Sequence, residues 1–227
     1  MQAQTHPDIE HIVVDGASTD GTLALIRAHQ TGSMRLISEP DQGIYDAMNK
    51  GLAEATGDVV CFLNADDIYA GTDVLARVVE QMSQEHLEAL FGDVAFFHAG
   101  SPQQTVRRYS SRSFSPERIA WGWMPAHPAL FLRREVYERT GSFRTDFRIA
   151  GDFEFVARAF TKKTLRYRHF PEVLVRMRTG GISTEGWNNT LLLNREVLRA
   201  CRENGIQTNT MKILSKYPAK LLEYFRK

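Results

Sequence analysis

The stretch that decides the fold is residues 58–67, Asp-Val-Val-Cys-Phe-Leu-Asn-Ala-Asp-Asp. Its first part, Asp58–Leu63, contains a continuous apolar run, which predicts a strand buried on both faces. Asn64, Asp66 and Asp67 follow directly, at the carboxyl end of that strand. Ligands of open α/β sheets bind beyond the carboxyl ends of the strands. The stretch therefore predicts a buried sheet and a polar site at its edge.

Strands and helices alternate on both sides of this stretch. We predict further strands at Ile9–Val14, Met34–Ser38 and Ala89–Phe97, and helices at Thr22–Gln30, Ile44–Ala55 and Val74–Met82. Such alternation is typical of an α/β fold with a mostly parallel central sheet and helices on both faces. Beyond residues 100–125, which indicate loops with short elements, we expect a strand at Ala129–Leu132 and helices at Gly151–Phe160 and Asn188–Asn204.

The size and composition are those of a globular protein. With 227 residues, 43% of them hydrophobic and 24% charged, the chain can form one α/β domain with a small appendage. Cys61 and Cys201 lie far apart without metal-ligand spacing, which argues against a disulfide framework or a zinc site and suits a reducing compartment. No apolar run approaches the roughly 20 residues that span a bilayer, and residues 1–10 lack a signal-peptide core. We expect a cytoplasmic protein.

The net charge of +1 hides an uneven distribution. Residues 1–100 carry 16 acidic and 4 basic side chains, whereas residues 101–227 carry 11 acidic and 24 basic ones. An acidic half suits a divalent cation, and a basic half suits phosphates or an anionic membrane. Alternatively, folding interleaves the two halves and their fields partly cancel.

Two adjacent carboxylates, Asp66 and Asp67, form the first candidate site. They repel each other unless a cation or hydrogen bonds compensate, and Mg²⁺ or Mn²⁺ prefers such oxygens and completes its shell with water and phosphates. The alternative is a helix-capping loop, but other acidic loops at the same sheet edge favour a metal site. Asp15 follows the first strand, where a carboxylate can bind a base or a ribose, or merely form a turn with Gly16.

Later segments offer a base and two loop residues. Asp152 and Glu154 are two positions apart, so they do not share a helix face, and we expect only one to point into the site. Asp152, at the presumed helix start, can act as a general base or as a helix cap. His127 can bond a phosphate or a sugar hydroxyl. Trp123 can stack on a sugar, although aromatic side chains more often pack in a core or loop.

Taken together, the motifs resemble the family 2 glycosyltransferases, which have the GT-A fold. The matching segments, in family order and covering about residues 5–185, are Val13–Thr22, Glu39–Gly51, Ala55–Gly57, Phe62–Asp67, His127–Phe131 and Gly151–Phe155. Each motif is weak by itself, and the ordered set is strong. The segment Asp41–Gly51 is similar to the matching segment in the branch of this family that builds polysaccharide, lipopolysaccharide and glycolipid sugars.

The resemblance implies a metal-dependent, inverting transfer of a sugar from a nucleotide-sugar, with UDP or GDP, to a glycan or lipid-linked acceptor. It implies that Asp15 contacts the base, that Asp41 lines the nucleotide pocket, and that Asp66 and Asp67 hold Mg²⁺ or Mn²⁺. Asn64 replaces the first Asp of the usual Asp-x-Asp motif and can still bond a ribose or phosphate oxygen. Asp152 is implied to be the general base. A nucleotidyltransferase is disfavoured because we find no glycine-rich, basic phosphate loop near the N-terminus.

The family normally begins with a strand and helix that this sequence lacks. We therefore predict an N-terminally truncated GT-A domain over residues 1–187 and a C-terminal helical extension over residues 188–227. Without that strand a buried neighbour becomes an edge, so a non-catalytic remnant with weak donor binding is the alternative function.

The C-terminal segment Met211–Lys227 combines apolar residues with Lys212, Lys216 and Lys220 along one helical face. It can lie on an anionic membrane near a lipid-linked acceptor or pack on the domain as a last helix. We expect no nucleic-acid partner.

Overall fold

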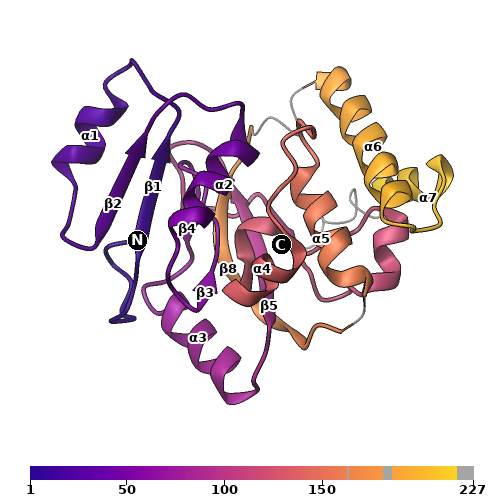
Figure 1. The fold of residues 1–227 in the computed structure, drawn as a ribbon, viewed down its shortest axis with the longest axis horizontal. Helices are drawn as coiled ribbons and strands as arrows, with labels where there is room; N and C mark the ends of the chain where they lie inside the picture. Colours follow the sequence, from indigo (N-terminus) through magenta and orange to yellow (C-terminus); the bar gives the residue numbers. More distant parts are fainter. Residues whose placement is uncertain (163, 181–185, 219–227) are drawn as a thin grey trace.

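A computed structural model describes residues 1–162, 164–180 and 186–218, and it confirms the α/β class. The N-terminal part consists of β1 (His11–Asp15), α1 (Thr22–Ala28) and β2 (Met34–Ser38). Strands β1 and β2 pair in parallel, from His11↔Met34 to Asp15↔Ser38. Helix α2 (Ile44–Glu54) packs on β1. In Figure 1 this two-stranded unit stands to one side of the larger sheet.

The larger sheet has six strands in the order β3-β7-β5-β8-β4, with β6 beside β5. They are β3 (Val59–Val60), β4 (Ile68–Tyr69), β5 (Ala89–Phe97), β6 (Arg107–Tyr109), β7 (Leu130–Arg133) and β8 (Tyr167–Arg178). Only the β5–β8 pair is parallel in this sheet. The mostly parallel arrangement predicted from the sequence is therefore wrong in this detail. No helix separates β3 from β4 or β5 from β6, and these connections are too short for a parallel crossover.

Helices cover both faces of the larger sheet, as predicted. They are α3 (Val74–Gln84) on one face, and α4 (Arg134–Thr140), α5 (Gly151–Thr161) and α6 (Gly186–Glu203) on the other, with short 3₁₀ helices η1 (Pro116–Trp121) and η2 (His127–Ala129). Strand β5 alternates between the two cores: Leu90 packs with Val78 and Met82 of α3, whereas Phe91 packs with Phe155 and Phe160 of α5. This alternation is what a strand buried on both faces requires.

The chain after residue 186 packs against the rest of the fold. Helix α6 supplies Val197, Ala200 and Cys201 to the core that contains α5. Helix α7 (Thr210–Leu214) packs on α6 and η1 through the buried Ile213. Lys216 is also buried, whereas Lys220 lies outside the described residues. For the described part of the segment, these contacts favour packing on the domain. No described helix has the length and hydropathy needed to cross a bilayer.

Candidate functional site

The first group of candidate residues surrounds the end of β1. Asp15 is 6% exposed, and its Oδ2 accepts hydrogen bonds from the Ser18 backbone N (3.0 Å) and the Ser38 hydroxyl (2.9 Å). These hydrogen bonds, Ser18 first, lower the pKa of the Asp15 carboxyl. Asp15 is therefore a fixed, ionised acceptor at the carboxyl end of a parallel strand pair.

Asp41 lies directly beside the loop that follows Asp15. A Cβ added to Gly16 would lie 2.5 Å from Asp41 Oδ2, so only glycine allows this approach. Asp41 Oδ1 accepts a hydrogen bond from the Gly43 backbone N at 2.9 Å. Gly43 has φ of +119°, a conformation that favours glycine, and the next residue begins α2. The structure thus places Asp41 beside the loop that follows Asp15, and the nucleotide-pocket roles that the resemblance implies for both residues stay predictions.

The stretch that decides the fold places Asn64, Asp66 and Asp67 in the turn between β3 and β4. Asn64 Nδ2 donates to Asp67 Oδ2 at 3.1 Å, and the Asp67 backbone N donates to the Asn64 carbonyl at 3.0 Å. Arg178, the last residue of β8, donates its backbone N to Asp67 Oδ1 (3.3 Å). Its guanidinium lies 3.4 Å from Asp66 Oδ2. Arg178 was not predicted as a site residue, and it balances part of the acidic charge.

This turn fits a divalent cation of the Mg²⁺ or Mn²⁺ type. Burial, together with the charge of Asp66, raises the pKa of Asp67 to about 6, although the hydrogen bond from Asn64 opposes part of this rise. A bound cation would relieve the repulsion between the two carboxylates. The described residues contain no cluster of three or more His, Cys, Asp or Glu side chains able to hold a metal. Water and donor phosphates would have to complete the shell, which is usual for Mg²⁺.

A third group forms around the first turn of α5. Asp152 is half-buried, and its Oδ1 accepts hydrogen bonds from the Phe153 backbone N (2.8 Å) and the Tyr45 hydroxyl (3.2 Å). Glu154 is buried and instead forms an ion pair with Arg158 on the same helix, at 2.8 Å. The two carboxylates therefore point to different surroundings, as their spacing predicted.

The backbone just before α5 is held by a carboxylate from α6. Glu196 is 7% exposed and accepts hydrogen bonds from the backbone N of Arg148 (2.8 Å), Ile149 (2.9 Å) and Ala150 (2.8 Å). An acidic side chain is well placed at a helix N-terminus, where backbone N–H groups lack partners. Glu196 was not predicted as a site residue, because it lies 44 positions after Asp152.

His127 connects the last two groups. Its ring stacks on Phe62, two residues before Asn64, with centroids 5.8 Å apart. Burial lowers the pKa of His127, and the negative charge of Asp152 raises it, which places the two side chains near each other. A neutral imidazole beside Asp152 can donate or accept a hydrogen bond.

Trp123 has different neighbours. Its ring stacks on Tyr109 with centroids 6.3 Å apart, and the Arg118 guanidinium lies 5.5 Å over it. These contacts do not link Trp123 to the carboxylates, so its sugar-stacking role stays a prediction.

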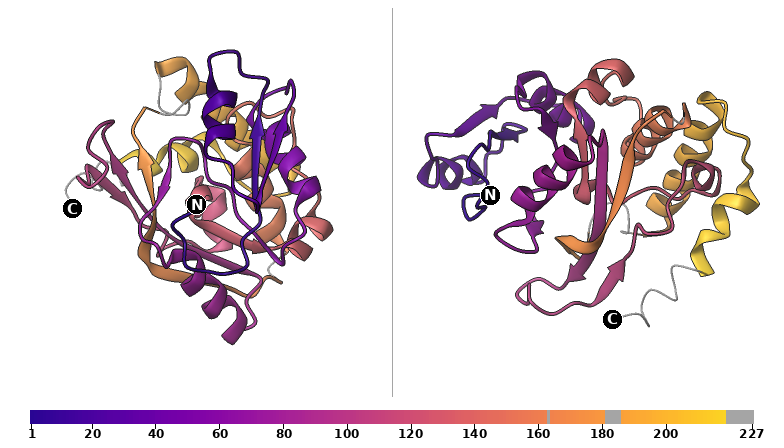
Figure 2. Two further views of the ribbon diagram at one scale, coloured as in Figure 1. Left: turned by 90° about the vertical axis from the view of Figure 1, so that its left-hand side faces the viewer. Right: turned by 90° about the horizontal axis from the view of Figure 1, so that it is seen from below.

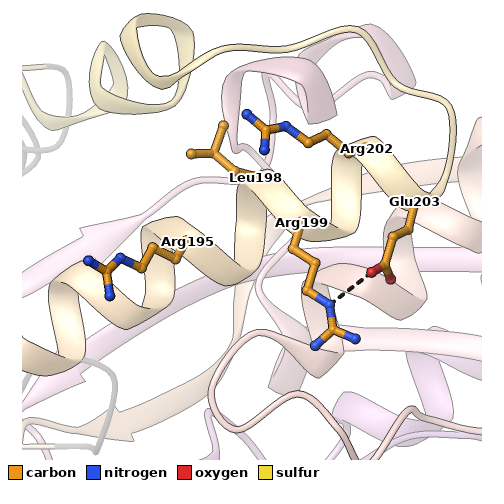
Figure 3. Close-up of a pocket in the computed structure, with 5 residues that line it drawn as sticks. All are labelled: Arg195, Leu198, Arg199, Arg202 and Glu203. Carbon is orange, nitrogen blue, oxygen red and sulfur yellow. Dashed lines mark hydrogen bonds and ion pairs between the residues drawn. The ribbon is translucent and has the colours of Figure 1, made fainter.

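A shallow hollow on α6 contains none of the predicted residues. Figure 3 shows its lining side chains, with Arg199 turned towards Glu203 and paired with it at 2.8 Å. The remaining lining residues are Arg195, Leu198 and Arg202. The candidate site is therefore defined by the carboxylates on the loops and helix starts.

Comparisons with known proteins agree on one family. The model of glycosyl transferase family 2 matches residues 1–150. A PGL/p-HBAD biosynthesis glycosyltransferase of Mycobacterium bovis is 36% identical over 172 residues, which is 73% of this chain and 64% of that protein. An uncharacterized glycosyltransferase of Mycobacterium tuberculosis is 37% identical over 155 residues, 66% of this chain and 57% of that protein. The chain thus matches less than two thirds of the length of these relatives.

Solved structures show the fold. Staphylococcus aureus TarS 1–349 in complex with UDP-GlcNAc has a TM-score of 0.69 at 16% identity, covering 97% of this chain and 66% of that one. The mannosyltransferase PcManGT from Pyrobaculum calidifontis, in complex with GDP-Man and Mn²⁺, has a TM-score of 0.63 at 22% identity, covering 98% and 64%. Both are GT-A transferases. With the family model matching 150 of the 227 residues, the chain has the GT-A fold and belongs to glycosyl transferase family 2.

Proposed function

We propose that this protein transfers a sugar from a nucleotide-sugar donor to a glycan or lipid-linked acceptor, with inversion at the sugar. Family membership and the names of the relatives support a glycosyltransferase. The observation that carries the proposal is the placement of three carboxylate groups at successive loop and helix starts: Asp15 with Asp41, Asp66 with Asp67, and Asp152. Phe62, two residues before Asn64, stacks on His127. Tyr45, in the helix that follows Asp41, places its hydroxyl 3.2 Å from Asp152 Oδ1.

The donor would occupy the first two groups. Asp15 would accept from the base and Asp41 would line the nucleotide pocket. The two similar structures carry UDP-GlcNAc and GDP-Man, so a UDP- or GDP-sugar is the donor class that we propose. Asp66 and Asp67, with Asn64 beside them, would hold Mg²⁺ or Mn²⁺, which when bound supplies positive charge to the leaving diphosphate.

The acceptor would be activated at the third group. Asp152 would take the proton of the attacking hydroxyl as the new glycosidic bond forms. His127 would bond a phosphate or a sugar hydroxyl, and Trp123 would offer its ring to a sugar face.

Peripheral membrane contact through the C-terminal segment is part of this proposal for a lipid-linked acceptor. On α7, Met211 is 82% exposed, Leu214 is 45% exposed, and Lys212 lies over the ring of Trp121 at 5.5 Å. Exposed apolar side chains beside a half-buried lysine suit the surface of an anionic bilayer.

The test is donor turnover by the purified protein with and without a metal ion. We expect release of UDP or GDP from a panel of nucleotide-sugars with Mn²⁺ or Mg²⁺ and none with EDTA. Asp67→Ala and Asp152→Ala should each reduce the rate by about 100-fold or more. Glu138→Ala is the matched control, because Glu138 is an exposed carboxylate paired only with the nearby Arg134 among the described residues. Full activity in both site variants would exclude the assigned roles.

A further inference from the structure

The hydroxyl of Tyr45 reaches two oxygens at the candidate base. It lies 2.6 Å from the Ile149 carbonyl and 3.2 Å from Asp152 Oδ1. A tyrosine hydroxyl has one proton to donate, so the two oxygens compete for it. The Ile149 carbonyl is the nearer acceptor, whereas the negative charge of an ionised carboxylate strengthens the hydrogen bond to Asp152, because charge-assisted hydrogen bonds are roughly twice as strong as neutral ones. The position of this proton therefore depends on the charge of Asp152.

The ring of Tyr45 is held in place by its surroundings. Tyr45 is 5% exposed and stacks on Phe143 with centroids 6.1 Å apart. Its ring covers Gly151, where an added Cβ would lie 2.7 Å from the nearest ring atom. Burial, followed by the charge of Asp152, raises the pKa of Tyr45, so its hydroxyl stays protonated. The proton of the Tyr45 hydroxyl can thus rotate about the Cζ–Oη bond, whereas the oxygen stays in place.

Asp152 Oδ1 accepts a hydrogen bond from the Phe153 backbone N, and a second one from the Tyr45 hydroxyl when its proton is turned away from the Ile149 carbonyl. Among the described residues no hydrogen-bond partner of Oδ2 is found. Tyr45 and Phe153 together therefore fix the plane of the carboxylate and leave Oδ2 available.

We propose that Tyr45 is a positioning residue for the general base, which presents Asp152 Oδ2 to the acceptor and favours the ionised carboxylate. This inference rests on the proposed role of Asp152. The acceptor proton passes to Oδ2 as the acceptor oxygen bonds to the sugar, and the nucleoside diphosphate leaves with the electron pair. Oδ1 then becomes a weaker acceptor, and the Tyr45 hydroxyl turns to the Ile149 carbonyl. The Tyr45 proton stays on Tyr45 throughout.

Charged or titratable groups on the elements packed around the start of α5 must stay unchanged in a test. They are His127 from η2, Glu154 and Arg158 on α5, and Glu196 from α6. Tyr45→Phe removes one hydroxyl and leaves all of them in place, together with the ring that packs on Gly151.

The experiment measures kcat and KM against pH for the wild type, Tyr45→Phe, Tyr137→Phe and Asp152→Ala. Tyr137 is the matched control: it is 4% exposed, and its ring stacks in the same core on Phe155, at 4.9 Å. For Tyr45→Phe we expect kcat to fall about tenfold, with the donor KM and the melting temperature close to those of wild type. The acid limb of its pH–rate profile should differ from that of the wild type, because one donor to the carboxylate is lost.

Tyr137→Phe should keep the wild-type profile. An unchanged acid limb and kcat in Tyr45→Phe, with Asp152→Ala inactive, would overturn the role of Tyr45 and leave the proposed function standing. Full activity of Asp152→Ala would overturn both.

Discussion

Asp67 is a carboxylate whose surroundings oppose its charge. Its pKa is raised from the ordinary 3.8 to about 6, chiefly by burial. The folded state therefore binds more protons than the unfolded state between about pH 4 and pH 6. The free energy of unfolding therefore falls as the pH rises through this window. Above pH 6 it is lower by roughly 3 kcal/mol than it would be without the pKa shift. Above this window, the ionised carboxylate of Asp67 thus destabilises the folded protein.

Asp67→Asn should stabilise the protein at pH 8, because it removes the buried charge and its repulsion with Asp66. We expect a gain in melting temperature on the order of 5 °C in EDTA, which disappears below about pH 4. Added Mn²⁺ should raise the melting temperature of the wild type more than that of Asp67→Asn. Asp66→Asn serves as the control, because Asp66 is more exposed than Asp67. A lower melting temperature of Asp67→Asn at pH 8 would contradict this account.

At the residue scale, the sequence could identify Asp15, Asp41, Asp66, Asp67 and Asp152, since each follows a predicted strand or starts a helix. Their chemical roles stay predictions. Tyr45, Arg178 and Glu196 could not be found this way. Their partners lie far along the chain, with 107 positions between Tyr45 and Asp152 and 111 between Arg178 and Asp67. Only the folded chain shows which side chain meets which backbone group.

At the element scale, α6 and the start of α5 depend on each other. Glu196→Ala would leave the backbone N–H groups of residues 148–150, of which that of Ala150 is buried, without their acceptor. We expect the free energy of unfolding in urea to fall by about 3 kcal/mol, and by less for Glu196→Gln, which keeps one oxygen. Arg195→Ala, at the exposed neighbouring position, should change it by less than about 0.5 kcal/mol. Equal effects of Glu196→Ala and Arg195→Ala would disprove the role of Glu196.

Apart from the two-residue strand β4, which was not predicted, the helices and strands before residue 98 were predicted within a few residues, because apolar patterns and turn residues mark their ends. The segment 58–63 was expected to form one strand, and only Val59 and Val60 pair with β7. Strand β8 was not predicted, since it contains Pro171 and several charged residues, and only Leu174 and Val175 are buried. Its register shifts against β5 around Asp93 show that tertiary pairing, rather than its own pattern, determines this strand.

For the whole molecule, we predict uneven stability. Helix α1 buries none of its residues, Leu25 is 66% exposed, and β1 pairs only with β2 among the described residues. An isolated pair of strands is marginally stable, whereas β5 is buried in the larger sheet. Amide hydrogen exchange should therefore be faster in residues 11–38 than in residues 89–97. UDP with Mn²⁺ should slow exchange around Asp15. Equal protection of both regions would contradict this picture.

Helix α2 carries Asp41 just before its start and Tyr45 in its first turn. In the proposed function, the nucleotide pocket and the support of the base thus share one short piece of backbone. A substitution that shifts this turn to accommodate a different sugar or nucleotide would also move the hydroxyl beside Asp152. Donor preference and catalytic speed therefore cannot evolve independently here. Attempts to re-engineer donor choice at residues 41–44 should select for turnover together with affinity.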